Sequence, residues 1–321
     1  MNILFLNAGR RVELIRAFRN SFIDLGIDGR IITTDVQPMA PAFHLGDVKK
    51  ILPHSSSLNF VAELKKVCEA EKVALIIPLI DSDLLALSKL KKEFNGHGIT
   101  VLISPTEVIE TCRDKLKSSI FLGAHGFSSP SAALSLEKFA LQFPVVVKPR
   151  DGSSGINIFK ASTMSQLESV LEFVPNPMIQ ECVRGEEITT DVYSDENGNP
   201  RLAVPRLRLK VRGGEVAVGK IKRDSRLELL CMDIANELGA IGPINIQTVS
   251  AGSEHQVIEI NPRFGGGCPL SFAAGAPFVE WTIALAQGKP IEKIPINIED
   301  GKVMIRFDES LFFSSEELAC L

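Results

Sequence analysis

Val257-Ile-Glu-Ile-Asn-Pro-Arg-Phe-Gly-Gly-Gly267 is the stretch that decides the fold of this chain, and its apolar first half predicts a buried strand. Because side chains alternate along a strand, Glu259 and Asn261 share one face, roughly 7 Å apart. Pro262 ends the strand, Arg263 follows, and the glycines allow a tight turn or the close approach of a ligand. A carboxylate beside an amide oxygen suits a hard cation, and an arginine suits phosphate or carboxylate oxygens. The alternative is a core strand that ends in a polar loop.

Composition bounds the class of protein. The 321 residues predict two or three compact units, and 45% apolar residues are enough for packed cores. A net charge of −4, one Trp and one Tyr argue against a nucleic-acid partner. The six cysteines form no C-x-x-C pair, which argues against zinc and disulfide patterns. No apolar run spans a membrane and the N-terminus lacks a signal-peptide pattern, so we expect a soluble, cytoplasmic protein without a membrane partner.

The first part of the chain alternates short apolar runs with helical patterns, which predicts a doubly wound parallel sheet. Strands are expected at 2–7, 30–34, 74–78 and 100–103, with helices from 12 to Gly26 and over 58–72 and 82–95. The turn Asn7-Ala-Gly-Arg-Arg11 has one of the three glycines of a dinucleotide fingerprint, which disfavours nicotinamide binding. Asp35, Asp81 and Asp83 follow strands, where they either contact a substrate or, for the last two, cap helices.

A second unit begins at Ser104-Pro105, a helix-start pattern. A helical segment is expected from there to about 125, carrying Arg113-Asp-Lys115, and a short helix before Phe143-Pro144. Pro144-Val-Val-Val-Lys-Pro-Arg-Asp-Gly-Ser-Ser-Gly-Ile-Asn-Ile158 then predicts a strand bearing Lys148, a small-residue loop and another strand. This is no Walker A loop; it is a hairpin lid whose backbone N–H groups cover phosphates, or else an ordinary turn with a solvated lysine.

Strands 177–183 and 187–193 lead through the turn Asp195-Glu-Asn-Gly198 into Arg206-Leu-Arg-Leu-Lys-Val-Arg212. In that segment four cations alternate with three apolar residues, so period two places all four cations on one face. Such a face is either solvated or neutralised by an anionic ligand, because neighbouring like charges repel. Another strand is expected at Val216–Ile221.

A helix over Leu227–Leu238 precedes the strand Gly242-Pro-Ile-Asn-Ile-Gln247. Pairing of that strand with the opening stretch as an antiparallel hairpin would bring Gln247 beside Glu259 and Asn261, giving three oxygen donors on one sheet face. One helix over Leu270–Gln287 and a last strand over 303–307 complete the expected elements.

The order and spacing of these motifs resemble the ATP-grasp superfamily, and more narrowly a single unit similar to the large subunit of carbamoyl-phosphate synthetase. The motifs are Arg113-Asp-Lys115, Pro144–Gly155, Gln180–Glu187, Asn245–Gln247 and Glu259–Gly267, and the resemblance covers about 105–290. It implies a Rossmann-like pre-ATP-grasp domain over 1–104. An ATP-grasp domain of two α+β subdomains would follow over 105–295 (105–180 with the lid, 181–295 with the metal site), and then a strand and tail over 296–321.

The resemblance also implies an ATP site. Two lysines would hold the phosphates, the small-residue loop would be the lid, three hinge residues would contact the adenine edge, and a glutamate would take the ribose hydroxyls. In that order these residues are Lys115 and Lys148; Asp151, Gly152, Ser153, Ser154 and Gly155; Glu181, Cys182 and Val183; and Glu187.

Gln247, Glu259 and Asn261 would hold Mg²⁺, with Mn²⁺ as a substitute, by the same resemblance. Gln247 departs from the Asp or Glu common in the superfamily and matches the carbamoyl-phosphate synthetase type. The phosphoryl group and acyl phosphate would be stabilised by Arg263, Arg206, Arg208 and Lys210. A catalytic role for Cys268 is disfavoured, because acyl phosphate chemistry needs no such nucleophile.

The function implied is that of an ATP-dependent carboxylate–amine ligase with small-molecule substrates, which the sequence does not name. One alternative is the phosphorylation of bicarbonate or another small acid together with a partner chain. The sequence shows neither a second ATP-grasp half nor a glutaminase region, so a complete carbamoyl-phosphate cycle is not expected from it alone. A non-catalytic ATP-binding regulatory module is the other alternative. A homodimer is expected at family level only.

Overall fold

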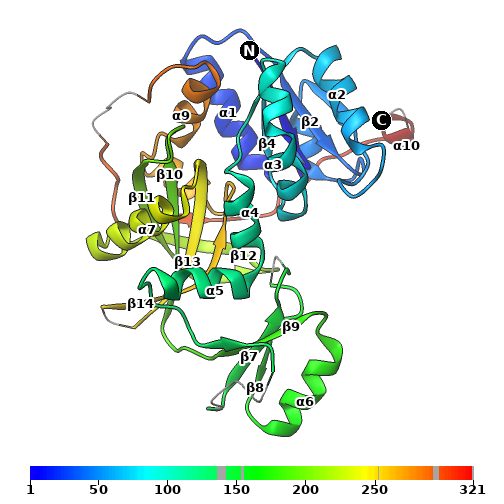
Figure 1. Ribbon diagram of the computed structural model, residues 1–321. Helices are drawn as coiled ribbons and strands as arrows, with labels where there is room; N and C mark the ends of the chain where they lie inside the picture. The colour runs from blue at the N-terminus through cyan, green and yellow to red at the C-terminus, as the bar shows by residue number, and fades with distance from the viewer. Residues whose placement is uncertain (136–141, 153–154, 252, 292–295, 320–321) are drawn as a thin grey trace.

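The computed structural model describes residues 1–135, 142–152, 155–251, 253–291 and 296–319. Over these residues the strands form three sheets, which follow one another from top to bottom in Figure 1. A parallel five-stranded sheet lies at the top, a six-stranded sheet in the middle, and a four-stranded sheet at the bottom. The expected α/β class, with an α+β second part, is confirmed.

The five-stranded sheet has the order β3-β2-β1-β4-β5, and every pairing is parallel. Its elements in chain order are β1 (Asn2–Leu6), α1 (Val12–Asp24), β2 (Ile31–Asp35), η1 (Pro41–Leu45), β3 (Val48–Ile51), α2 (Phe60–Ala70), β4 (Val73–Pro78), α3 (Asp81–Gly96) and β5 (Thr100–Val101). The sequence analysis missed β3. Its central residues are two lysines, so the strand lacks an apolar run, and it lies at a sheet edge, where charged side chains are common.

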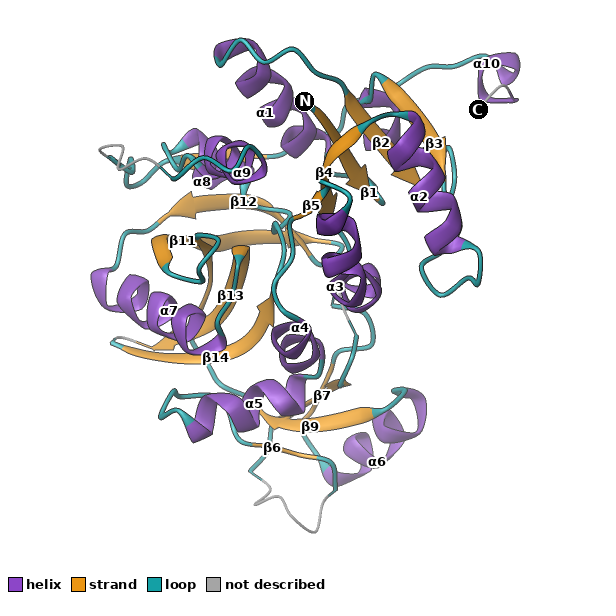
Figure 2. Ribbon diagram, turned by 45° about the horizontal axis from the view of Figure 1, so that its top comes forward, coloured by secondary structure: helices purple, strands orange, loops and turns teal. Residues whose placement is uncertain are grey.

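Both faces of this sheet are covered, as Figure 2 shows for α1 and α2. Leu4 and Leu6 pack with α2 and α3 on one face, while Ile3 and Phe5 pack with α1 on the other. Phe18 of α1 stands edge-on to Phe5 on one side and to Phe264 on the other, with ring centroids 5.1 and 6.1 Å apart. The N-terminal domain therefore shares one core with the segment that follows β14.

The four-stranded sheet has the order β6-β9-β7-β8. Its elements are β6 (Ala132–Ala133), β7 (Val145–Pro149), β8 (Phe159–Ala161), α6 (Met164–Phe173) and β9 (Pro177–Glu181), and α4 (Thr106–Arg113) and α5 (Lys115–Ala124) precede it. The single helical segment expected to about 125 is wrong, because Asp114 has an extended backbone and caps α5 by accepting from the backbone N–H groups of Leu116 and Lys117. The short helix expected before Phe143 falls largely on residues outside those described.

The six-stranded sheet is antiparallel, with the order β14-β13-β10-β11-β12-β15. Its elements are β10 (Glu186–Ser194), β11 (Pro200–Arg212), β12 (Glu215–Ile221), α7 (Ser225–Leu238), β13 (Gly242–Ala251), β14 (Glu254–Asn261), α8 (Pro269–Ala273), α9 (Phe278–Ala286) and β15 (Val303–Ile305); α10 (Ser315–Ala319) follows. Leu227, Cys231 and Ile234 of α7 cover one face of this sheet. On the opposite face Tyr193 packs against Phe278 and Trp281 of α9, and the remaining part lines the cleft described below.

One long helix over 270–287 was expected, and that prediction is wrong. Gly275, with φ of +108°, and Pro277 separate α8 from α9. Among the residues that the structure describes, no helix combines the length and apolar character needed to cross a bilayer.

Candidate functional site

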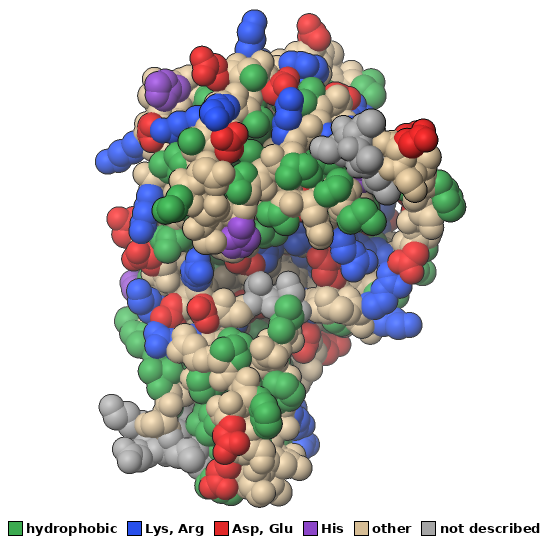
Figure 3. Space-filling model, turned by 90° about the vertical axis from the view of Figure 1, so that its right-hand side faces the viewer, with side chains coloured by type: hydrophobic (Ala, Val, Ile, Leu, Met, Phe, Trp, Pro, Cys, Tyr) green, Lys and Arg blue, Asp and Glu red, His purple; other side chains and the backbone are tan. Residues whose placement is uncertain are grey.

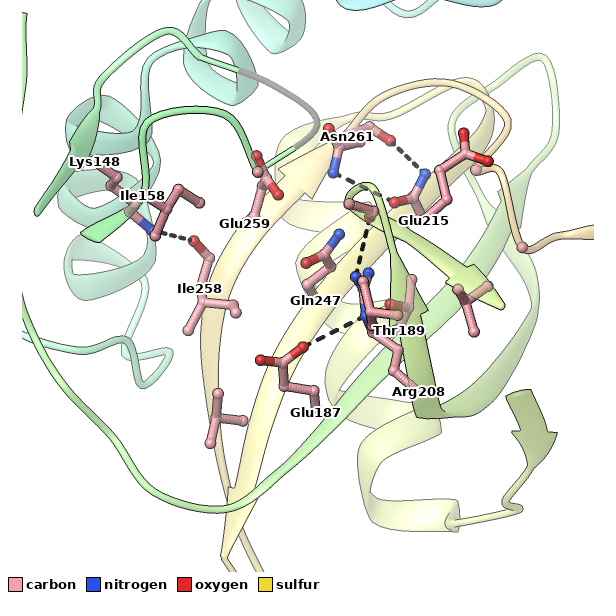
Figure 4. A pocket seen from close by; sticks show the side chains of 18 of the residues that line it. Lys148, Ile158, Glu187, Thr189, Arg208, Glu215, Gln247, Ile258, Glu259 and Asn261 are labelled. Atoms are coloured by element: carbon pink, nitrogen blue, oxygen red, sulfur yellow. Dashed lines mark hydrogen bonds and ion pairs between the residues drawn. The ribbon is translucent and has the colours of Figure 1, made fainter. Parts of the chain in front are cut away.

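A cleft of about 610 Å³ opens between the four-stranded and six-stranded sheets. Such a volume is typical of small-molecule sites. The space-filling view in Figure 3 shows a hollow at mid-height with Lys and Arg side chains beside it. In the close-up of Figure 4, Lys148 approaches from one side, while Gln247, Glu259 and Arg208 project from the six-stranded sheet.

The floor of the cleft is a row of side chains across four neighbouring strands. Arg206 on β11 lies opposite Thr189 on β10, and Thr189 lies opposite Gln247 on β13. Gln247 in turn lies opposite Glu259 on β14, so the predicted hairpin pairing of these two residues is confirmed. All four residues line the cleft.

A second row holds Asn261 opposite Asn245. The Asn245 amide donates to the carbonyl oxygens of Asn261 and Arg263, at 3.4 and 3.1 Å, which fixes the chain just after β14. Arg263 is then held from the N-terminal domain: its Nε and Nη2 donate to the two carboxylate oxygens of Asp81, at 2.9 and 2.6 Å. Asp81 therefore neither caps α3 nor lies free; it is the first residue of that helix and positions Arg263.

Lys115 reaches the floor from the opposite side. It is buried at the start of α5, where its Nζ lies 3.4 Å from Glu259 Oε1 and donates to the carbonyl of Gly152. Asp114 fixes the start of that helix and pairs with Arg150, while the backbone N–H of Lys115 donates to the Arg150 carbonyl. The break between α4 and α5 thus places a cation beside the Glu259 carboxylate.

Lys148 projects from β7 and is 5% exposed. Its Nζ donates to the carbonyl of Ile258 at 3.2 Å, across the cleft on β14 (Figure 4). The pKa of this ammonium is lowered to about 8, because burial outweighs the opposing effect of the Glu259 charge and the nearby charge of Lys115 acts in the same direction as burial. A buried ammonium with no carboxylate in hydrogen-bonding contact is suited to an anionic ligand.

Arg206 lines the cleft but is committed to the protein. It is 2% exposed, and its Nε and Nη2 donate to Asp191, each at 2.7 Å. Ser271 donates to the same carboxylate at 2.6 Å. Arg208 is less constrained: its Nε lies 3.4 Å from Glu187 Oε2, and its Nη2 donates to the Gly214 carbonyl. Of these two arginines, Arg208 has more capacity left for a ligand.

Beyond Arg208 the alternation of β11 fails. Register shifts on both sides of Lys210 bulge the strand, so Val211 rather than Lys210 lines the cleft. Lys210 and Arg212 are exposed. The prediction that four cations share one face is therefore wrong, and Lys210, expected near the phosphoryl group, lies outside the cleft.

The glycines at 265–267 serve close packing rather than unusual backbone angles, since none has a positive φ. A Cβ at the first would lie 3.0 Å from Asn245 Nδ2. At the second and third it would overlap the guanidinium groups of Arg11 and Arg206. These three positions are therefore glycine because neighbouring side chains leave no room for a Cβ.

Arg11 and Glu215 line the cleft, and the sequence analysis named neither as a site residue. Arg11 Nη1 donates to Glu215 Oε1 at 2.6 Å, and Arg306 Nη1 donates to Glu215 Oε2 at 3.2 Å. The members of this cluster are separated by 204 and 91 residues in sequence. No short sequence motif links these three residues, so the cluster becomes visible only in the fold.

Three family models match successive parts of the chain. The PylC-like N-terminal domain matches residues 3–102, and the RimK-like ATP-grasp domain matches 112–226. The model described as ATP-grasp in the biosynthetic pathway with Ter operon matches 173–305. The two ATP-grasp models thus cover the cleft and both sheets that form it.

Several named proteins are similar to this chain over most of its length. The carbamoyl-phosphate synthase of Methanobrevibacter smithii is 22% identical over 63% of this chain, and the 3-methyl-D-ornithine–L-lysine ligase of Methanosarcina acetivorans is 23% identical over 89%. A biotin carboxylase from Campylobacter jejuni superimposes with a TM-score of 0.74 at 16% identity, covering 92% of this chain and 73% of that one. The chain is an ATP-grasp protein. It spans 60% of the M. smithii synthase and 75% of the M. acetivorans ligase.

In this ATP-grasp protein the residues expected around the nucleoside line one end of the cleft. They are Glu181, Cys182, Val183 and Glu187, together with Gly155 of the lid loop. Apolar side chains that suit a nucleobase line the same cleft: Val146, Ile158, Val249 and Ile258. Their individual contacts with a nucleotide stay predictions.

The rest of the lid loop is only partly described. Asp151 and Gly152 border an adjoining cavity of about 100 Å³, which Lys115 and Glu259 also line. Ser153 and Ser154 lie outside the described residues. The lid prediction therefore rests on the β7–β8 hairpin, whose antiparallel pairing the structure shows.

The donor set of this ATP-grasp protein fits Mg²⁺ or Mn²⁺. Gln247, Glu259 and Asn261 offer oxygen alone, as hard cations prefer. Among the described residues no group of three His, Cys, Asp or Glu side chains gathers, so one carboxylate stands between amides. Magnesium commonly keeps waters and substrate phosphates as its remaining ligands, which matches so small a protein contribution.

Asp35 and Asp83 are used within the N-terminal domain. Asp35 accepts from the backbone N–H of Gly9 at 2.9 Å. Asp83 is fully buried and accepts from the Asn7 amide at 2.5 Å, and burial raises its pKa. Neither lines the cleft.

Proposed function

We propose that this ATP-grasp protein is an ATP-dependent carboxylate–amine ligase. The observation that carries the proposal is the order of groups along the cleft. Along the strands, Val249 and the Glu187–Arg208 ion pair lie on one side of Gln247 and Glu259, Lys115 approaches Glu259 itself, and Asn261 and Arg263 lie on the other side. That order matches a nucleoside, its phosphates with a metal, and a transferring phosphoryl group beside an acid.

In the first step a carboxylate oxygen of the acid attacks the γ-phosphorus. The bond from that phosphorus to the bridging oxygen breaks, ADP leaves, and an acyl phosphate forms. In the second step the amine attacks the acyl carbon and the carbon–oxygen bond breaks. Inorganic phosphate departs with one former carboxylate oxygen, and the amine loses a proton.

The protein contributes position and charge to these steps. Lys115 and Lys148 would hold phosphate oxygens, and Arg263, fixed by Asp81, would face the charge that builds up on the transferring group. Gln247, Glu259 and Asn261 would hold Mg²⁺, which when bound neutralises phosphate charge and orients the γ-phosphoryl group. The β7–β8 hairpin would exclude water from the labile acyl phosphate.

The related proteins support a ligase more than a non-catalytic module. One of them is named as a ligase that joins 3-methyl-D-ornithine and L-lysine, and it aligns with 89% of this chain. The side chains expected to hold the metal and the ATP phosphates (Lys115, Lys148, Gln247, Glu259 and Asn261) all line the cleft, whereas a regulatory module would not need them together.

Transfer of ¹⁸O tests the proposal directly. A panel of acids labelled with ¹⁸O in the carboxylate, each paired with a panel of amines, is incubated with ATP and Mg²⁺. The proposal predicts that one ¹⁸O atom per turnover appears in inorganic phosphate for the correct pair. ATP hydrolysis that is stimulated by the substrates, but leaves the phosphate unlabelled, would contradict it. Labelled bicarbonate, tested without an amine, distinguishes the carbamoyl-phosphate-type alternative.

A further inference from the structure

One end of the cleft carries an ion-pair cluster assembled from three distant parts of the chain. Glu215, the first residue of β12, accepts from Arg11 in the loop before α1 and from Arg306 just after β15. Burial raises the pKa of this carboxyl, but the two guanidinium charges more than offset that effect, so Glu215 stays ionised. Two guanidinium groups therefore share the Glu215 carboxylate.

Arg306 has little left for a ligand. It donates to the carbonyls of Gly266 and Val216, and its Nε lies 3.5 Å from Glu13. Arg11 differs, because it lines the cleft and, within the described residues, its side chain donates only to Glu215. Arg11 therefore shares its carboxylate partner with Arg306 and keeps donor capacity on the side of the cleft.

Two further donors in the same cleft make no hydrogen bond to the described residues, although Arg208 Nε lies 3.4 Å from Glu187 Oε2. Thr189 is 4% exposed and its Oγ1 has no hydrogen bond within the described part of the chain. The same holds for the buried Nε of Arg208. Burial lowers the pKa of this guanidinium, the direction expected when a charge is only partly compensated. Because buried polar groups are ordinarily hydrogen-bonded, unpaired donors that line a cleft indicate where a ligand supplies acceptors.

We propose that Arg11 binds a second anionic group of the acid substrate, so that the acid is a dicarboxylic acid. This inference rests on the proposed ligase function. One carboxylate would be activated near Arg263 and Arg208, while the other would accept hydrogen bonds from Arg11. Glu215 and Arg306 are positioning residues that hold Arg11 against the cleft. The second group is an anion because a carboxylate makes the strongest hydrogen bonds with a guanidinium whose protein partner is already shared.

Binding measured without turnover tests the subsite. The protein is saturated with a non-hydrolysable ATP analogue and Mg²⁺. It is then titrated calorimetrically with succinate, glutarate and adipate, and separately with the monoamide of each acid. We expect at least one diacid to bind on the order of tenfold more tightly than its own monoamide, since a charge-assisted hydrogen bond is lost in the amide.

Variants assign the preference to the cluster. Arg11→Gln should abolish the diacid preference and leave monoamide binding unchanged, whereas Arg11→Lys should keep part of it. Glu215→Gln should weaken the diacid selectively, a readout that general loss of structure would not produce. Arg16→Gln is the matched control, because Arg16 lies in α1 just after Arg11, is half-exposed and pairs with Glu309, and it does not line the cleft.

Equal or absent binding of every diacid and monoamide by the wild-type protein would overturn the subsite, as would a loss in Arg11→Gln that affects both ligands alike. Thermal unfolding and binding of the ATP analogue show that each variant is folded. Failure of the ligase proposal is a different result, since it would appear as unlabelled phosphate in the ¹⁸O experiment while diacid binding is measured independently of chemistry.

Discussion

Arg263, in the segment after β14, and Asp81, at the start of α3, form a two-point ion pair in which Nε–Oδ1 is 2.9 Å and Nη2–Oδ2 is 2.6 Å. The pair joins the ATP-grasp part to the N-terminal domain. Burial alone would lower the pKa of the Arg263 guanidinium, but Asp81 outweighs it and raises the pKa. The N-terminal domain thus fixes the side chain that we place beside the transferring phosphoryl group.

Asp81→Asn should lower kcat for ADP release by about 10–100-fold, the range seen when a group that orients a site residue is removed. The KM for ATP should change little, because Lys115 and Lys148 are untouched. Steady-state kinetics measure both constants. Glu93→Gln, which alters an exposed ion pair with Lys65, is the control. An unchanged kcat in Asp81→Asn would show that the orientation of Arg263 does not matter.

The buried ion pair of Arg206 and Asp191 should contribute to the free energy of unfolding. Asp191→Asn leaves a buried guanidinium without its partner and should cost about 3–5 kcal/mol of unfolding free energy. Denaturant unfolding measures the change. Arg212→Gln removes an exposed pair with Asp308 and should leave the unfolding midpoint in place. If Arg206→Gln were stable but inactive, Arg206 would instead belong with the phosphoryl-binding residues.

Local sequence patterns were enough to predict that β13 pairs with β14 beside the expected metal-binding residues. Two apolar runs joined by a short polar segment predict the β13–β14 hairpin, and Gln247 lies opposite Glu259 as expected, although a register shift between Gln247 and Thr248 was not predicted. The expected alternation failed on β11, because a bulge at Lys210 depends on the strands on either side. The segment Val48-Lys-Lys-Ile51 carried no apolar run, so β3 was missed even though the fold pairs it in parallel with β2.

ATP binding should weaken as pH rises through the pKa of Lys148, which burial lowers to about 8. Below that pH the ammonium is charged and attracts phosphate oxygens; above it the neutral amine does not. One unit either side of the pKa, from pH 7 to 9, the affinity for an ATP analogue should fall about tenfold. Lys148→Arg keeps its charge and should remove the dependence. A flat profile in the wild-type protein would contradict the role given to Lys148.

Gly266→Ala should impair binding of the acid. Its Cβ would overlap Arg11 Nη1 and lie 3.0 Å from Glu215 Oε1, so the ion pair must shift. We expect a several-fold rise in the KM for the acid with the KM for ATP unchanged. Gly123→Ala is the control, because Gly123 lies in α5 with open space around it, and alanine favours the helix by roughly 0.5–1 kcal/mol. Equal kinetics for both variants would remove Arg11 from substrate binding.

The part of the site that sequence did not predict depends on tertiary contact. Arg11, Glu215 and Arg306 meet only because α1, β12 and β15 converge at one end of the cleft. The role of Asp81 likewise needed the fold, since 182 residues separate it from Arg263. Sequence predicted that the glycines at 265–267 allow a tight turn or the approach of a ligand; they do line the cleft, and their packing against Asn245 and two arginines needed the fold.

Glu259→Gln tests the central claim most directly. Glu259 is the one carboxylate among the expected metal-holding residues, and the change keeps its shape while removing the charge. With the acid and amine found by ¹⁸O transfer, we predict that ADP release falls at least about a hundredfold while thermal unfolding stays near the wild-type value. ADP release close to the wild-type rate in Glu259→Gln would contradict the assignment of this cleft as a magnesium-dependent phosphoryl-transfer site.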